Sequence, residues 1–254
     1  MAIIIKSQRE IELIKESCKR LEYVHNELSK IIKPGISTYE INAYGDKLIR
    51  EQEGIPNFLN YNGYPASICT SVNEEVVHGI PKKNVILKDG DIISLDAGLI
   101  YKGYHSDAAR TYAVGTVSDD VKKLMEVTKQ SFFEGIKMAK AGNHLFDISN
   151  AIAAYINKFG YGIVQDLVGH GVGTKLHEDP QIPNFEQKRR GPLLRPGMTL
   201  AIEPMVNLGT WEVEWLDDDW TVVAADGSPS AHYENTVLIT DGEPEILTLG
   251  NFTD

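Results

Sequence analysis

The chain has 254 residues, of which 42% are hydrophobic and 24% are charged, a composition that indicates a soluble globular protein of one or two domains. Its 36 acidic and 25 basic residues give a formal net charge of -11, which disfavours a nucleic-acid-binding surface. The one basic cluster, Lys188-Arg189-Arg190, is typical of a solvated loop. With only Cys18 and Cys69 and a short apolar start, the sequence predicts no disulfide framework, signal peptide or membrane span, and hence a reducing, cytoplasmic setting.

Apolar residues at helical spacing predict four helices in two pairs. Ser7 with Glu10 and Ser37 with Glu40 form capping boxes that begin the first two helices. Glycine and proline, or Ala-Gly, end the periodic segments. The expected helices cover residues 7–33, 37–53, 118–140 and about 145–159.

The segment between the two helix pairs has a β-type pattern. Residues 57–65 are aromatic and irregular, so we expect a loop that packs over a core or lines a pocket. Residues 68–78 predict a strand and turn that deliver His78. An apolar run that Asp96 closes, a second short run at 99–101, and a further strand at 110–117 predict a hairpin.

Two carboxylates, Asp96 and Asp107, stand eleven positions apart beside this hairpin. A carboxylate that follows a buried strand needs a positive partner or a metal ion. Taken alone, the pair is more typical of a turn cap at Asp96 and a solvated side chain at Asp107 than of a metal site. The metal interpretation therefore depends on the rest of the chain.

An internal repeat appears when the chain is shifted along itself so that Lys33 falls on Lys140. Gly35 and Ile41 then coincide with Gly142 and Ile148, and the segment 86–90 coincides with 193–197. Six positions after each of the last glycines, the run ends in an acid, Asp96 in one copy and Glu203 in the other. We predict a single domain, 1–254, made of two structural repeats (about 1–115 and 116–254) that fold face to face. Chance alignment of short apolar runs is the alternative.

The second half supplies further candidate ligands. His170 lies among three glycines in LVGHGVG, residues 167–173, and the glycines permit close approach of a ligand. A phosphate cradle is a weaker interpretation, because no GxGxxG or following Lys-Ser/Thr pair is present. His177 follows in the chain, Glu203 ends an apolar strand, and Glu234 stands just before the expected strand 237–240.

These residues, with VHGIP at His78, GHGVG at His170 and AIEP at Glu203, resemble those of a type I methionine aminopeptidase of bacterial kind. The resemblance spans residues 3–249. It implies an α+β fold, the pseudo-two-fold duplicated pita-bread (creatinase/aminopeptidase) fold, with a central antiparallel sheet and two helix pairs.

The resemblance also implies a site for two divalent metal ions, cobalt, manganese, iron or zinc. Asp96 would bind one ion, Asp107 and Glu234 would bridge both, and His170 with Glu203 would complete the other. A hydroxide activated there would attack the first peptide bond, with Glu203 carrying the proton toward the leaving amine. His78 and His177 would contact the substrate and the reaction intermediate rather than the metal.

For the methionine side chain the resemblance implies a pocket of Tyr61, Tyr64, Cys69 and Trp220, with Phe58 near the rim. Cys69 could equally be a buried thiol. The chain departs from the family pattern at four positions, which are Leu176 for an aromatic residue, Ala108 for Thr, His232 for Gln and Asn235 for His. With Leu176 at this position, the sequence does not determine what forms that wall of the pocket. The other three departures should tune metal affinity.

The implied function is co-translational removal of the initiator methionine from proteins with a small second residue. The partner would be the amino terminus of a nascent polypeptide, with ribosome docking left open, no nucleic-acid site, no membrane, and a monomer as the default. A proline-directed relative such as aminopeptidase P usually has an additional amino-terminal domain. A non-catalytic peptide-binding protein or a creatinase-like hydrolase would lack this full set of five ligands.

Overall fold

The structure, a computed structural model, describes residues 2–249. Two helix pairs form, α1 (Gln8–Ser29) with α2 (Thr38–Glu51) and α3 (Asp119–Ile136) with α4 (Leu145–Ile156). The predicted capping boxes are present, since the Glu10 and Glu40 carboxylates accept hydrogen bonds from the backbone N–H of Ser7 and Ser37 at 2.8 and 2.9 Å. Within the described residues no helix is long and apolar enough to cross a membrane.

All four helices end a little before the predicted position. After α1, the N–H groups of Lys30 and Ile31 donate to carbonyls three positions back, and Met138, Ala139 and Phe159 do the same after α3 and α4. These tighter bonds replace the α-helical pattern in the last turn. Apolar periodicity continues through such a turn, so the sequence pattern extended the helices too far.

The first half contains a four-stranded antiparallel sheet. Its strands are β1 (Ile55–Pro56), β2 (Ile68–Val72), β4 (Ile92–Tyr101) and β5 (Tyr104–Ala113), with β4 pairing with the other three. Between β1 and β2 lies the 3-10 turn η1 (Tyr61–Gly63) in the expected loop.

The prediction that Asp96 closes a strand was wrong, because β4 continues through Ala97 and Gly98 to Tyr101. A carboxylate side chain does not interrupt the backbone ladder, in which Asp96 lies opposite Cys69 on β2 and Ala109 on β5. Gly98 allows the ladder to continue beside the 57–65 loop, because a Cβ there would lie 2.4 Å from Asn57 Nδ2. The predicted hairpin turn occurs instead at Lys102-Gly103, where both residues have positive φ.

The second half contains a five-stranded antiparallel sheet in the order β15-β14-β9-β7-β8. Two three-stranded sheets, β13-β10-β6 and β11-β12-β3, complete the fold. The bounds of these strands are β3 (Glu75–Val77), β6 (Gly162–Ile163), β7 (Gly169–Gly171), β8 (Glu178–Ile182), β9 (Thr199–Ile202), β10 (Met205–Asn207), β11 (Val213–Trp215), β12 (Val222–Ala224), β13 (Ser230–His232), β14 (Asn235–Leu238) and β15 (Glu245–Ile246).

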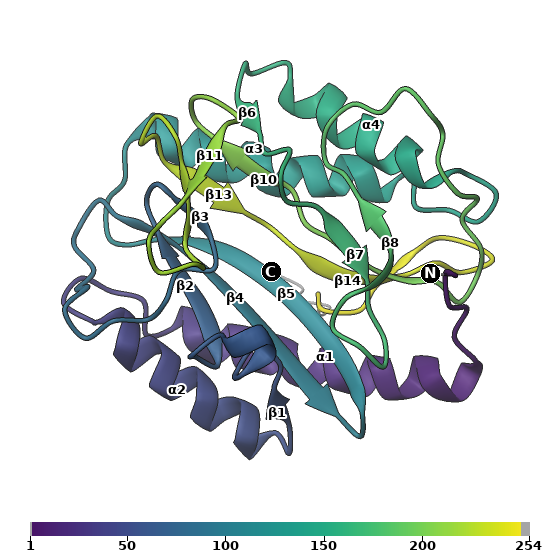
Figure 1. Cartoon of the computed structure of the whole chain (residues 1–254), viewed down its shortest axis with the longest axis horizontal. Helices are drawn as coiled ribbons and strands as arrows, with labels where there is room; N and C mark the ends of the chain where they lie inside the picture. Colours follow the sequence, from purple (N-terminus) through teal and green to yellow (C-terminus); the bar gives the residue numbers. More distant parts are fainter. Residues whose placement is uncertain (1, 250–254) are drawn as a thin grey trace.

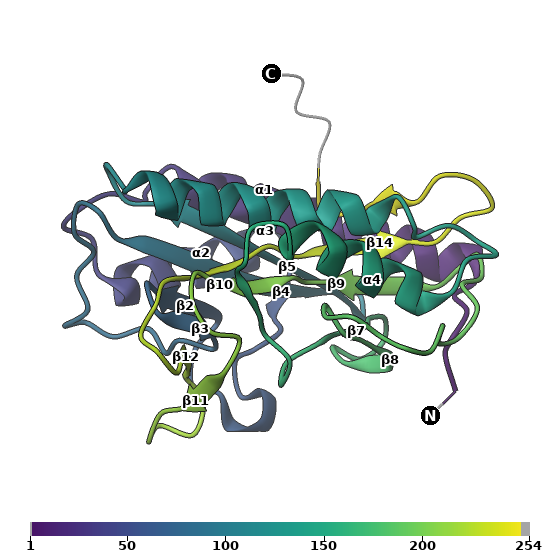
Figure 2. The ribbon, with the colours of Figure 1, turned by 90° about the horizontal axis from the view of Figure 1, so that it is seen from above.

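The two main sheets join where β5 meets β14, near the middle of the molecule in Figure 1. Thr236 Oγ1 accepts from the Asp107 N–H at 3.1 Å and donates to the Asp107 carbonyl at 2.9 Å, and the Glu234 N–H donates to Ala109 O at 3.0 Å. Figure 2 shows α1 and α3 along one face of the strands, with the β7–β8 and β11–β12 hairpins on the other. The sheet junction therefore places loops of both halves over Asp107 and Glu234.

Each half has its own apolar core. The core of the first half includes Leu21, Ile41 and Ile93, and that of the second includes Phe132, Ile152 and Leu200; all six are 0% exposed. Burial on this scale stabilises each half by about 1.5–3 kcal/mol per large apolar side chain. Two smaller apolar clusters contain residues of both halves, for example Val77 with Val222 and Cys69 with Leu176.

Matched contacts recur at the shift that aligns the two repeats. Gly35 N–H donates to Leu87 O at 2.8 Å, and Gly142 N–H donates to Leu194 O at 3.1 Å. The isolated bridges Ser37↔Ile86 and His144↔Leu193 are related by the same shift. These contacts support the two-repeat organisation that we propose for 1–254, of which residues 1 and 250–254 lie outside the described part.

Candidate metal centre and substrate pocket

A cavity of about 280 Å³ opens on the hairpin face of the molecule. All the site residues predicted from the sequence line it, namely Phe58, Tyr61, Tyr64, Cys69, His78, Asp96, Asp107, His170, His177, Glu203, Trp220 and Glu234. They come from β2, β4, β5, β7, the 3-10 turn η1 and the connecting loops of both halves. The fold thus brings together residues as far apart in sequence as Phe58 and Glu234.

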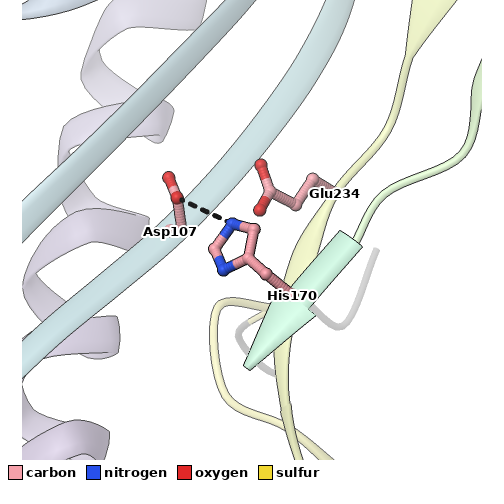
Figure 3. A group of neighbouring side chains, drawn as sticks. All are labelled: Asp107, His170 and Glu234. Carbon is pink, nitrogen blue, oxygen red and sulfur yellow. Dashed lines mark ion pairs between the residues drawn. The ribbon is translucent and has the colours of Figure 1, made fainter. Parts of the chain in front are cut away.

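A cluster of four acids and two imidazoles, those of His170 and His232, forms the floor of this cavity. Asp107 on β5, His170 on β7 and Glu234 just before β14 offer ligand atoms that all lie within 4.8 Å of one another, and their side chains point toward a common centre (Figure 3). His170 Nε2 is 3.7 Å from Asp107 Oδ2 and 3.6 Å from Glu203 Oε1. Asp96 joins the same cluster from β4, as its pKa is affected by Glu203 and Asp107.

Burial and mutual repulsion make this cluster unfavourable without a cation. Burial raises the pKa of Asp96 to about 7 and those of Asp107, Glu203 and Glu234 well above their ordinary values, and the charges of neighbouring acids raise those of Asp107 and Glu234 further. Among the residues that the structure describes, the guanidinium that contacts Glu234 is that of Arg110, which donates to the backbone carbonyl rather than to the carboxylate. Four acids in one buried site are therefore neutralised either by protons or by cations bound among them.

The hydrogen bonds of the cluster leave ligand atoms free. Within the described residues, Asp96 Oδ1, Asp107 Oδ1 and Glu234 Oε1 are buried without a hydrogen-bond partner. His170 Nδ1 donates to Gly171 O at 2.9 Å, which keeps the lone pair on Nε2, and burial lowers the pKa of this imidazole to about 3. Unpartnered carboxylate oxygens and a neutral imidazole are a donor set that fits divalent cations.

Aromatic and histidine side chains form the upper part of the cavity. The Tyr61 hydroxyl lies 2.7 Å from His177 Nδ1, and the His177 ring centroid is 4.3 Å from that of His170. Trp220 contacts the edges of Tyr64 and His78, at 5.1 and 6.2 Å between ring centroids. Burial lowers the pKa of His78 to about 4, so its imidazole is neutral at pH 7.

Cys69 and Leu176 belong to the apolar wall of this recess, in a cluster with Phe58, Tyr64 and Ala66. Burial raises the pKa of the Cys69 thiol well above its ordinary value, so the side chain is a neutral, apolar group. Leu176 is 2% exposed and forms the part of the pocket wall that the sequence did not determine. Both residues therefore shape the recess rather than carry charge.

The three remaining departures from the family pattern surround the cluster. His232 Nε2 lies 3.5 Å from Glu203 Oε2. Asn235 Oδ1 accepts from Arg110 Nη2 at 2.6 Å and Thr248 Oγ1 at 3.0 Å. Ala108 contributes its carbonyl, which lies 2.8 Å from His25 Nε2.

Sequence reasoning missed several apolar residues of the cavity, namely Val77, Leu167, Val168 and Met205, as well as Asn62. A usable signal existed for three of them, because Leu167 and Val168 directly precede the glycine-rich segment and Met205 follows Glu203-Pro204. Val77 is the first residue of VHGIP and Asn62 lies in the 57–65 loop, so both belong to segments that the sequence marked, although nothing marked these two side chains themselves.

The paired helices, the antiparallel strands and the buried carboxylate–imidazole cluster define a metal-dependent hydrolase with the pita-bread fold. The model of metallopeptidase family M24 matches residues 12–241. The chain belongs to this family and, within it, to the methionine aminopeptidases.

Two relatives support the assignment to the methionine aminopeptidases. A methionine aminopeptidase from Clostridium acetobutylicum is 53% identical over 97% of this chain and 99% of its own length. The crystal structure of methionine aminopeptidase from Thermotoga maritima superposes with a TM-score of 0.96 at 44% identity, covering 98% of this chain and 100% of that one. The expected α+β pita-bread fold is thereby confirmed.

A proline-directed relative shares the fold over a smaller part of its length. The Xaa-Pro dipeptidase from Bacillus anthracis gives a TM-score of 0.79 at 25% identity and is matched over 97% of this chain but 62% of its own. The likeness thus covers the domain that the two proteins share.

Proposed function

We propose that this protein removes the initiator methionine from newly made proteins whose second residue is small. The observation that carries the proposal is a single cavity in which an apolar, aromatic recess adjoins a buried cluster of acids and imidazoles. The recess suits a thioether side chain, and the cluster suits a hydrolytic metal site. The methionine aminopeptidases among the relatives support the same assignment.

We further propose that five side chains hold two divalent cations, cobalt, manganese, iron or zinc. Asp96 would bind one, His170 and Glu203 the other, and Asp107 and Glu234 both. When bound, such cations acidify water and polarise the carbonyl of a peptide bond. Their positive charge also offsets the repulsion among the four buried acids.

Glu203 is the residue that we assign to proton transfer. Its carboxylate lies between the imidazoles of His170 and His232, at 3.6 and 3.5 Å, and faces the cavity. A carboxylate that faces both the cluster and the substrate recess can act as a general base and then as a general acid. Glu203 would take a proton from the attacking water and pass it to the departing amine.

His78 and His177 are the candidate substrate contacts. Both line the cavity, the ring centroid of His177 lies 4.3 Å from that of His170, and the pKa of each of the two is lowered by desolvation. Neutral imidazoles can donate a hydrogen bond to the scissile carbonyl without opposing the charge of the cations. Phe58, Tyr61, Tyr64, Cys69 and Trp220 would enclose the methionine side chain.

The setting is proposed to be cytoplasmic, with nascent polypeptide amino termini as substrates and a monomeric enzyme. Docking on the ribosome is compatible with this function and is a separate question. The net charge of -11 gives no general attraction to nucleic acid.

The test is release of free methionine from Met-Ala-Ser, compared with cleavage of Ala-Pro peptides, by metal-stripped protein with and without manganese, iron, cobalt or zinc. Metal-dependent cleavage of Met-Ala-Ser alone is expected. Cleavage only before proline would move the protein to the proline-directed branch. No cleavage with any metal would support a non-catalytic peptide-binding role.

A further inference from the structure

The 173–177 loop, which is the part of the β7–β8 connection that follows Val172, contributes Leu176 and His177 to the cavity. Unlike the buried ligands, His177 is exposed, so packing alone does not fix its imidazole. His177 Nδ1 lies 2.7 Å from the Tyr61 hydroxyl, and the His177 ring centroid lies 4.3 Å from that of His170. Both contacts depend on the path of this loop. What holds the loop therefore decides where His177 lies.

Glu178, the first residue of β8, closes the loop with both of its carboxylate oxygens. Oε1 accepts from the Lys175 N–H at 3.2 Å and the Thr174 hydroxyl at 3.4 Å. Oε2 accepts from Lys6 Nζ at 2.6 Å, and the side chains of Lys6 and Glu178 are each 3% exposed. A buried carboxylate needs such a partner, because an unpaired charge at this depth is strongly unfavourable.

Lys6 lies in the segment that precedes α1, and its backbone is held in place as well as its side chain. Its backbone N–H donates to Gly197 O at 2.8 Å. Gly173 leaves room for the ion pair, since a Cβ there would lie 2.6 Å from both Lys6 Cε and Glu178 Oε1. In both ribbon views the amino-terminal stretch lies on the side of β7 and β8 (Figures 1 and 2).

The other end of the loop is tied to the strand that carries Asp107. The His105 N–H on β5 donates to Gly173 O at 2.8 Å. The loop is therefore held at one end by β5 and at the other by the amino-terminal segment. His177 directly precedes Glu178, the residue that pairs with Lys6.

We propose that Lys6 is a positioning residue for catalysis, which acts through Glu178 to hold the 173–177 loop and thereby His177 in the cavity. The inference rests on the substrate-contact role proposed for His177. It assigns to a residue outside all helices and strands a part in turnover rather than in metal binding.

The first experiment measures turnover of Met-Ala-Ser by the metal-loaded full-length Lys6→Met and Glu178→Gln variants. Each change keeps the shape of the side chain and removes its charge, and each should lower kcat about tenfold with less change in KM, because a displaced contact group costs turnover. The double variant should recover part of the loss, since it leaves no lone buried charge. Affinity for Mn²⁺, measured by calorimetry, should stay unchanged.

Lys15→Met is the matched control. Lys15 also pairs with a glutamate at 2.6 Å, Glu245, but the two side chains are 33% and 49% exposed. Loss of this pair should leave kcat unchanged, because exposed pairs contribute little.

The second experiment separates positioning from general stability by adding each change to His177→Ala. If Lys6 acts through His177, Lys6→Met should not lower kcat further in that background. A full additional loss there, or unchanged kcat in both single variants, would overturn the proposal. If His177→Ala alone keeps full kcat, the substrate-contact role of His177 fails and the positioning proposal fails with it, while methionine release by the unmodified enzyme still tests the proposed function separately.

Discussion

At the scale of single residues, the proposed ligands combine burial with unused hydrogen-bonding capacity. Asp107, His170 and Glu234 are 4%, 7% and 2% exposed, yet carboxylate oxygens of Asp107 and Glu234 have no partner in the part of the chain that the structure describes. In a structural ion-pair network those oxygens would be paired. This difference favours a metal site over a structural network.

Glu203→Ala and His170→Ala should each abolish most turnover while the protein stays folded. The two apolar cores lie apart from the cluster, so secondary structure and cooperative unfolding should persist. Loss of proton transfer at Glu203 alone should cost about 10²–10⁴ in kcat. Methionine release and circular dichroism check both parts, with the exposed Glu243→Ala as the control. Retained turnover in a metal-loaded variant would refute the assigned roles.

His25 should make the protein less stable in acid. Burial lowers the pKa of its imidazole to about 3, whereas the unfolded chain takes up a proton below its ordinary pKa of 6.5. The contribution of neutral His25 to the free energy of unfolding is therefore fully present above pH 6.5 and is lost as the pH falls toward 3. At pH 5 the free energy of unfolding should be lower by about 2 kcal/mol for this reason. Urea unfolding in EDTA at pH 7.5 and pH 5 should show a smaller loss of stability for His25→Gln. Equal losses in the two proteins would contradict this.

Candidate site residues could be predicted from the sequence because the motifs VHGIP, GHGVG and AIEP, which contain His78, His170 and Glu203, are distinctive. Val77 and Asn62 could not, since their place in the cavity depends on how β3 and η1 lie against the second half. An apolar residue in a strand looks the same in sequence whether it faces a core or a cavity.

At the scale of elements, β7 places His170 by close contact with β9. Gly169 makes this possible, because a Cβ there would lie 2.4 Å from Ala201 O. His170 is opposite Ala201, which stands two positions before Glu203. The distance between His170 and Glu203 thus depends on the absence of a side chain at Gly169.

Gly169→Ala should weaken metal binding by about 10–100-fold, the range found when residues that orient metal ligands are changed. The added methyl group must push β7 away from the backbone of β9 and carry His170 with it. Calorimetric titration with Mn²⁺ measures the change. Gly242→Ala is the control, since its nearest atom to a new Cβ is a side-chain oxygen at 3.9 Å. Equal affinities in the two variants would contradict the expectation.

The existence of the four helices could be predicted from caps and periodicity, whereas their last turns could not. The choice between α-helical and tighter closing bonds at Lys30 or Met138 depends on local geometry that leaves apolar spacing unchanged. The continuity of β4 through Asp96 was missed for a related reason, because a polar side chain was taken to end a backbone ladder that its neighbours continue.

At the scale of the whole molecule, the site joins two halves that have separate cores. Asp96 and Asp107 come from the first half, and His170, Glu203 and Glu234 come from the second. The shift between the repeats, which was visible in the sequence, recurs in the bridges Ser37↔Ile86 and His144↔Leu193. The particular contacts that hold the two halves together, such as that of Thr236 with Asp107, are contained in no local sequence pattern.

Metal binding should therefore stabilise the whole fold. A ligand at 100 times its Kd adds about 2.7 kcal/mol to the free energy of unfolding if the unfolded chain does not bind it. Urea unfolding with Mn²⁺ should show this gain over EDTA, and Asp107→Asn should remove most of it. A stability that does not respond to Mn²⁺ in the unmodified protein would argue against ligands shared between the halves.

Because the five proposed ligands are distributed over both halves, they are synthesised at different times. A ribosome delivers the acids of the first half early, His170 and Glu203 later, and Glu234 last of the five. No amino-terminal fragment that stops short of Glu234 holds the full set of donors, even if its own helices and strands have formed. Hydrolytic activity should therefore appear abruptly once Glu234 has joined the fold, so that incomplete chains cannot act on other nascent proteins.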